Sequence, residues 1–187
     1  MAIQVREGTI EEIKERLTEM HTDLNKINYL ESASKVPGFS FEIKRFLWSE
    51  LARLYEGRKM YERAAKAIAN KAAAEVTFKD KIDGYVTAAE LYSRLGKVES
   101  ADDMFVRAMR DANVEQKAKV RLARKNVYSV SASELERAGK KGSAVKFYEK
   151  LIKMKIDDSE RAEIKEKLMR TYKALGMFRE AKLLSGV

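Results

Sequence analysis

The stretch AELYSRLGKVESADDMF, residues 89–105, places Tyr92, Gly96 and Ala101 at successive intervals of four and five residues. The same spacing recurs in three other stretches, with two substitutions at the key positions. These stretches are ARLYEGRKMYERAAKAI (52–68), SELERAGKKGSAVKFY (133–148) and MRTYKALGMFREAKLL (169–184). A short unit repeated in this way along a chain indicates stacked copies of one supersecondary structure.

Each unit has the pattern of two helices joined by a tight turn. A glycine just past a helix accepts the left-handed backbone that ends it, and a small alanine lets two helices approach closely. The turn positions follow one another at intervals of 37, 43 and 37 residues, and they are Lys59, Gly96, Gly139 and Gly176. The longer middle interval leaves open whether six additional residues lengthen a helix or form a loop. The sequence therefore predicts an all-α fold of about four antiparallel helical hairpins.

The segments LYSRLGKVESADDMF and TYKALGMFREAKLL closely match the Tyr–x₃–Gly–x₄–Ala core of tetratricopeptide repeat (TPR) proteins. Over about residues 42–187 the chain resembles TPR proteins and their looser relatives of the SNAP type. Lys59 replaces the glycine of the first unit, Leu135 replaces the tyrosine of the third, and the proline usual between TPR units is missing. The resemblance implies a right-handed solenoid, and we assign residues 39–187 to this TPR-like repeat domain.

Residues 1–38 precede the repeats and are predicted to form a long amphipathic helix followed by a turn. Thr9 and Glu12 have the spacing of a capping box, and the helix would run toward Pro37. Its apolar residues recur at alternating steps of three and four, which is the spacing of a coiled-coil seam. They are Ile10, Ile13, Leu17, Met20, Leu24 and Ile27. This helix either caps the first repeat or pairs with a second copy in a homodimer.

The residue types argue against catalysis, cofactors and bound metals. The chain has no cysteine, and its single histidine, His21, lies in the N-terminal segment. Asp102 and Asp103 are adjacent, so on a helix their side chains diverge by about 100°. Asp157 and Asp158 are expected to start a helix. No glycine-rich phosphate loop and no metal-ligand spacing occurs in the sequence, so we do not expect an enzyme.

The distribution of apolar and charged residues bears on location and partners. No run of 18 apolar residues and no signal-peptide pattern occurs, which predicts a cytoplasmic protein without membrane insertion. Abundant Lys, Arg and Glu without cysteine is typical of proteins from thermophiles. The net charge of +9 is uneven, because residues 114–156 contain 12 basic and 4 acidic residues. A localised positive field of this kind attracts acidic partners.

The segment KAKVRLARK, residues 117–125, is the densest part of this basic region. On a helix, four of its cations and one tyrosine share an arc of about 100° with no acid among them, whereas Lys119 points elsewhere. The residues on the arc are Lys117, Arg121, Arg124, Lys125 and Tyr128. The next hairpin extends the basic surface with Lys140, Lys141, Lys146, Lys150 and Lys153. A smaller basic group in the first unit comprises Arg58, Lys59, Arg63 and Lys66.

These features predict a non-enzymatic adaptor that binds a ribonucleoprotein, with the ribosome and its RNA as the leading candidate. Phosphates would contact the cations, and Tyr128 would stack on an unpaired base. A dimer formed through the N-terminal seam would bridge two particles, by analogy with the small basic ribosome dimerisation factors that silence translation during hibernation.

Three alternatives remain open. In the first alternative, the cations belong to ordinary solvated helix faces, and acids on neighbouring helices compensate their charge. In another alternative, the protein is a protein–protein scaffold that binds an acidic or amphipathic peptide in a concave groove, as TPR proteins commonly do. A SNAP-like role in membrane fusion rests on general shape alone.

Overall fold

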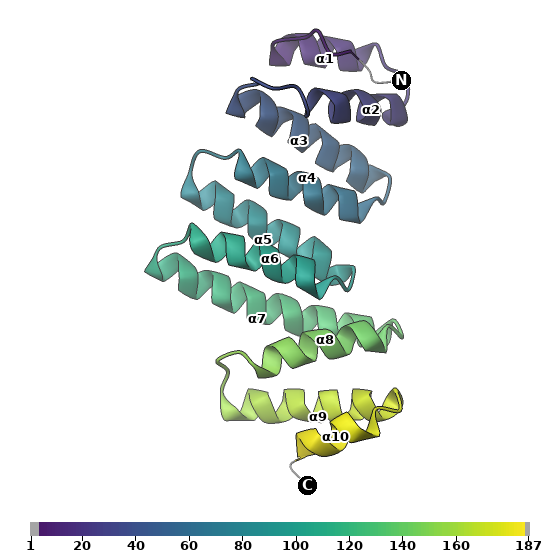
Figure 1. Ribbon diagram of the computed structural model, residues 1–187, viewed down its shortest axis with the longest axis vertical. Coiled ribbons are helices and arrows are strands. Elements are labelled where there is room, and N and C mark those ends of the chain that lie inside the picture. Colours follow the sequence, from purple (N-terminus) through teal and green to yellow (C-terminus); the bar gives the residue numbers. More distant parts are fainter. Residues whose placement is uncertain (1–3, 186–187) are drawn as a thin grey trace.

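The computed structural model describes residues 4–185 as ten α-helices, and this part of the chain contains no β-strand (Figure 1). The helices are α1 (Ile10–Thr18), α2 (Asp23–Ala33), α3 (Phe41–Gly57), α4 (Tyr61–Ala73), α5 (Phe78–Arg94), α6 (Val98–Arg110), α7 (Val114–Arg137), α8 (Lys141–Ile152), α9 (Asp158–Ala174) and α10 (Phe178–Ser185). The predicted all-α fold is confirmed. The first three residues of the predicted segment 1–38 and the last two of the predicted domain 39–187 lie outside the described residues.

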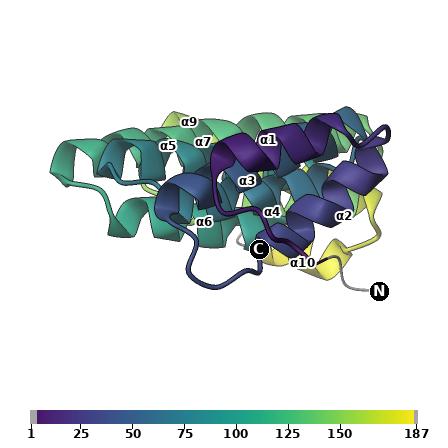
Figure 2. The same cartoon turned by 90° about the horizontal axis from the view of Figure 1, so that it is seen from above.

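The helices follow one another down the molecule in chain order, as hairpins (Figure 1). Each hairpin packs against the next: α5, for example, contacts its own partner α6 and also α4 and α7. The turns inside the hairpins from α3 to α10 lie at one edge of the molecule, and the turns between these hairpins lie at the other edge (Figure 1). Seen from above, α5, α7 and α9 form one layer, with α4, α6 and α10 in the layer beneath (Figure 2).

The turn inside each repeat has the conformation that the sequence predicts. Lys59, Gly96, Gly139 and Gly176 all have positive φ angles, between 58° and 76°. In every case the amide of the following residue donates to a carbonyl five residues back, as from Met60 to Tyr55 at 2.8 Å. This bond closes the end of the first helix. Lys59 is the one described residue other than glycine in the left-handed region, so its turn stores strain that the other three turns avoid.

The predicted small residues of the second helices lie in the interior, where the helices pack against one another. Ala64, Ala101, Ala144 and Ala181 are all buried, which confirms their predicted packing role. A close contact lies between α4 and α5. There, a Cβ added to Gly84 would lie 2.7 Å from the Cβ of Ala72. The two helices can approach this closely only because position 84 carries no side chain.

The N-terminal segment differs from its prediction, because it forms two helices instead of one. Thr9 and Glu12 form the predicted capping box at the start of α1. The helix then ends at Thr18, and a second cap begins α2: the Thr22 hydroxyl accepts a 3.2 Å hydrogen bond from the amide of Asn25. An N-cap threonine has an extended backbone, so it breaks a continuous helix at this point.

The predicted dimer seam is consequently divided between two helices. Ile13, Leu17 and Ile27 are buried in a core that α1 and α2 share with α3 and α4. Leu24 is 54% exposed, and Ile10 and Met20 are partly buried. The seam is therefore not a continuous free surface, and half of its side chains stabilise the chain's own fold.

Most of the remaining buried residues form a second core that extends from α4 to α10. Ile68 and Leu91 are partly buried and pack against both cores, so the two are joined at the middle of the molecule. None of the described helices combines the length and the apolar character needed to cross a membrane.

Candidate functional site

Six cationic and three apolar side chains line a cleft of about 610 Å³, which we name the basic cleft. Its walls come from the ends of α6 and α8, the N-terminal half of α7 and the turn that follows α8. The lining residues are Met109, Arg121, Leu122, Arg124, Lys125, Lys150, Lys153, Met154 and Lys155. Among the described residues that line the cleft, none is acidic.

The helix α7, which provides four residues of the cleft, is longer than the first helices of the other hairpins. It has 24 residues, seven more than the 17 of α3, α5 and α9, and the loop before it is one residue shorter than the loop before α5. The six additional residues between Gly96 and Gly139 therefore lengthen a helix. Asn113 and Gln116 begin α7 with a reciprocal capping box, in which each side chain accepts a 2.9 Å hydrogen bond from the other residue's amide.

Asp102 on α6 lies behind two of the cations of the cleft. Its carboxylate accepts hydrogen bonds from Arg124 and from Lys150, and a third from the hydroxyl of Tyr128 at 2.5 Å. The Asp102 side chain is 19% exposed, which makes it one of the least exposed carboxylates that form an ion pair here. Adjacent Asp103 points away and pairs with Arg107 at 3.0 Å, as the predicted divergence of the two carboxylates requires.

The charges around Asp102 determine its protonation. Burial raises its pKa, but the hydrogen bonds from Lys150 and Tyr128 and the charge of Arg124 outweigh burial and hold the pKa below its ordinary value. Burial, together with the hydrogen bond to Asp102, raises the pKa of the Tyr128 hydroxyl. Asp102 is therefore ionised and Tyr128 neutral throughout the physiological pH range.

Tyr128 cannot stack on a base, contrary to its predicted role. Its side chain is fully buried between Phe105 and Phe147, with ring centroids 5.6 and 5.2 Å away in edge-to-face geometry. Arg124 covers the Tyr128 ring at 5.4 Å. The helical arc placed Tyr128 among cations, but α7 also packs against α6 and α8, which bury that part of the arc.

Acids on neighbouring helices also neutralise several predicted binding cations. Lys125 pairs with Glu160 of α9 at 2.6 Å, and Lys146 pairs with Glu99 of α6 at 3.5 Å. Together with the Arg124 and Lys150 pairs to Asp102, these contacts agree for part of the surface with the alternative in which acids on neighbouring helices compensate the cations. Half of the cations that line the cleft, namely Arg124, Lys125 and Lys150, have a structural partner.

The other half of the lining cations has no partner of this kind. Arg121, Lys153 and Lys155 are exposed and form no salt bridge within residues 4–185. Arg121 and Lys153 were predicted from the sequence, whereas Lys155 was not, because it lies in the turn after α8 and outside the helical spacing of the other cations. These three side chains form what we call the free rim of the basic cleft.

The structure does not bring all the predicted cations to this cleft. Lys140 and Lys141 lie at the turn between α7 and α8, at the edge of the molecule opposite to the turn that follows α8 (Figure 1). Lys117 is on α7 but does not line the cleft, and Lys119 pairs with Glu115 of its own helix at 2.7 Å. The basic surface is therefore divided, and the cleft brings together only part of the predicted cations.

One cation of the smaller predicted patch of the first unit is paired with an acid of α2. Arg63 lies 3.5 Å from Glu31 of α2 and 6.0 Å from the centre of the Tyr55 ring. Lys59 occupies the strained turn, while Arg58 and Lys66 are exposed. Glu31 also accepts a hydrogen bond from the Tyr55 hydroxyl, so it connects α2 to Arg63 of α4 and to Tyr55 of α3.

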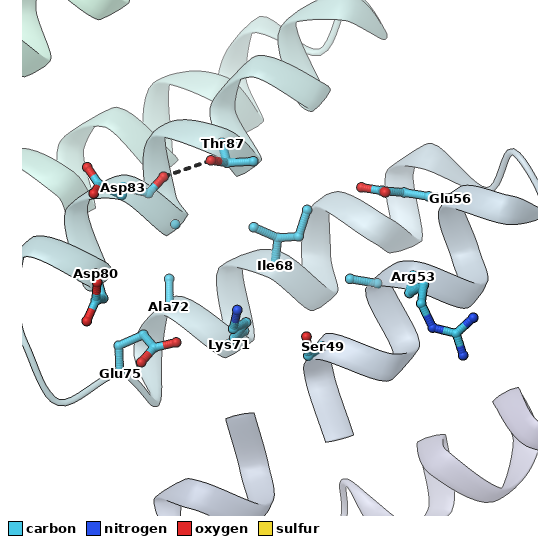
Figure 3. Close-up of a pocket in the computed structure, with 12 residues that line it drawn as sticks. Ser49, Arg53, Glu56, Ile68, Lys71, Ala72, Glu75, Asp80, Asp83 and Thr87 are labelled. Atoms are coloured by element: carbon cyan, nitrogen blue, oxygen red, sulfur yellow. Dashed lines mark hydrogen bonds between the residues drawn. The ribbon is translucent and has the colours of Figure 1, made fainter. Parts of the chain in front are cut away.

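A second hollow, of about 470 Å³, lies between α3, α4 and α5 (Figure 3). Four of its lining residues are acidic, namely Glu56, Glu75, Asp80 and Asp83. Arg53 and Lys71 are its two cations, and Arg53 is bonded to Glu50 at 2.7 Å. An acidic peptide entering this hollow would meet four carboxylates, so the hollow does not suit the acidic ligand of the scaffold hypothesis.

Comparison with protein-family models and with curated proteins does not assign the chain to a family. The chain matches no protein-family model, and no curated protein resembles it at a significant level. Across residues 4–185, no group of three or more His, Asp or Glu side chains is arranged to hold a metal ion.

Proposed function

We propose that the protein is a cytoplasmic, TPR-like helical-repeat adaptor that binds a ribonucleoprotein through the basic cleft, with the ribosome as the leading candidate. One observation carries this proposal: a concave site with six cations and, among its described lining residues, no acid. A site of this composition attracts phosphates from a distance and holds them through charge-assisted hydrogen bonds.

The paired and the unpaired cations of the cleft contribute to binding in different ways. Asp102 and Glu160 hold Arg124, Lys125 and Lys150 in place and cancel part of their charge. The free rim supplies net positive charge that no internal acid offsets within the described chain. RNA phosphates release condensed counterions when they meet such cations, so affinity falls with rising salt.

An acidic protein segment would use the same cations, and it is the competing partner. A bridging role between two particles would require a dimer surface other than the N-terminal seam, because Ile13, Leu17 and Ile27 are buried within one chain. The adaptor proposal itself does not depend on a dimer.

A pull-down from cell extract tests the proposal. The tagged protein is expected to retain ribosomal RNA and ribosomal subunits at low salt and to lose them after nuclease treatment. Arg121→Glu combined with Lys153→Glu should abolish retention, because the pair reverses two charges of the free rim. Retention that survives nuclease and depends on an acidic protein would replace this proposal with the scaffold function.

The matched control for that variant is Lys173→Glu combined with Lys182→Glu in the last hairpin. Both residues are exposed and lie on α9 and α10, outside the basic cleft. This control changes the net charge by the same amount and should retain RNA. Equal loss in both variants would show that general positive charge, and not the cleft, carries the binding.

A further inference from the structure

The basic cleft has an apolar centre that a contact with phosphates alone does not explain. Leu122 is 56% exposed although it lies between Arg121 and Arg124 on α7. Met109 from α6 and Met154 from the turn after α8 line the same cleft and are partly buried. Three apolar side chains from three different elements therefore converge in the space that the cations surround.

The size and the apolar lining of this space fit an unpaired base of a nucleic acid. A volume of about 610 Å³ is within the usual range for sites that enclose small organic groups. In a duplex the faces of the bases are stacked on one another, and the backbone offers only charged and polar groups to a protein. An unpaired base has a free apolar face, which thioether and leucine side chains can cover.

The guanidinium group of Arg124 lies at the wall of the same cleft. This group is fixed by the hydrogen bond to Asp102, and its Nε is buried without a hydrogen-bond partner among the described residues. Buried donors in folded proteins nearly always have an acceptor. This nitrogen has almost no accessible surface, so a group in the cleft does not reach it, and Arg124 lines the cleft as a cation whose position Asp102 fixes.

We infer that the basic cleft binds one unpaired nucleotide of an RNA strand. The base lies against Leu122, Met109 and Met154, and the flanking phosphates contact the free rim. This inference rests on the proposed RNA-binding function and narrows it to single-stranded or bulged RNA. Because the contacts to the base are apolar and cover its face, the site tolerates any of the four bases.

Fluorescence anisotropy with three labelled RNAs tests the inference. The probes are a 12-nucleotide single strand, a blunt 12-base-pair duplex and the same duplex with one bulged nucleotide. At one fixed salt concentration, the single strand and the bulged duplex are expected to bind about tenfold or more tightly than the blunt duplex, as one apolar base contact allows.

Leu122→Ala is expected to reduce binding of the single strand by about fivefold, because the covered base face loses its main contact. Binding of the blunt duplex and the slope of affinity against salt should remain unchanged. Val130→Ala is the matched control, because Val130 is also 56% exposed and lies on α7 but does not line the cleft.

The outcomes separate this inference from the proposed function. Equal affinity for all three probes, with a steep salt dependence, overturns the nucleotide site and leaves RNA binding intact. A preference for unpaired RNA that Leu122→Ala does not change also overturns the site. Absence of binding to every probe at low salt contradicts both the inference and the proposed function.

Discussion

Replacing Asp102 by alanine should destabilise the fold far more than the same change at its neighbour Asp103. The variant leaves the fully buried Tyr128 hydroxyl without its charged acceptor, which costs about 1.5–3 kcal/mol. Arg124 and Lys150 also lose their partner. Their side chains are 26% and 39% exposed, so water screens both, and each pair adds about 0.5–1 kcal/mol at most. The expected loss in the free energy of unfolding is about 3 kcal/mol.

Asp103→Ala is the matched control for this substitution. Its carboxylate is 53% exposed and pairs within α6 with Arg107, a contact worth about 0.3–0.5 kcal/mol. Both variants replace an aspartate in the interior of α6 by alanine, so the gain in helix propensity cancels between them. Urea unfolding at pH 7, followed by circular dichroism, measures the difference. Equal stability of the two variants would refute the structural role of Asp102.

The contribution of Asp102 has a defined dependence on pH. Its pKa is lower in the folded protein than in the unfolded chain. The stabilisation is therefore fully present above the unfolded value of about 3.9 and is lost as the pH falls through the lower folded value. The stability difference between wild type and Asp102→Ala should stay constant from pH 8 to about pH 5 and narrow only in stronger acid. A difference that changed between pH 6 and pH 8 would contradict this assignment.

Thermal or urea unfolding of two further variants, each compared with a control, tests the backbone conformation. The variants are Lys59→Gly, with Gly139→Ala as its control, and Gly84→Ala, with Gly142→Ala as its control. Lys59→Gly should stabilise the protein by about 1 kcal/mol, because glycine removes the left-handed strain, whereas Gly139→Ala should cost about as much. Gly84→Ala should destabilise by about 1–2 kcal/mol through the clash with Ala72, although Gly142→Ala in open space on α8 should be neutral or stabilising. Stabilisation by Gly84→Ala would contradict the close approach of α4 and α5.

Local features of the fold could be predicted from the sequence because they depend on neighbouring residues. Gly96, Gly139 and Gly176 adopt positive φ at the predicted turns, and even Lys59 does so because the surrounding helices impose it. The turn depends on a left-handed residue between two helix patterns, which the spacing alone reveals.

The end of α1 and the start of α2 were not predicted, because apolar residues at steps of three and four occur both in one long helix and in two consecutive helices. The signal that could have located it is Thr22 followed by Asp23, a cap residue and an acid at the start of α2. A cap in the middle of an apolar seam predicts a helix start more directly than the seam predicts continuity.

The candidate site depended on contacts that no single helix contains. The arc on α7 correctly grouped Arg121, Arg124 and Lys125, but their partners Asp102 and Glu160 lie on other helices. A helical projection also could not show that Tyr128 faces Phe105 and Phe147. Which cations remain free is a property of helix packing, and so is the cleft that they form.

The salt dependence of RNA binding is the most direct test of the basic cleft. If the three cations of the free rim each neutralise one phosphate of a single strand, the logarithm of affinity should fall against the logarithm of salt concentration with a slope of about −2. Arg121→Glu with Lys153→Glu should remove measurable binding, while Lys173→Glu with Lys182→Glu keeps the wild-type slope. Wild-type protein that binds no RNA at 50 mM salt, or a rim variant that binds as wild type does, would contradict RNA binding by the basic cleft.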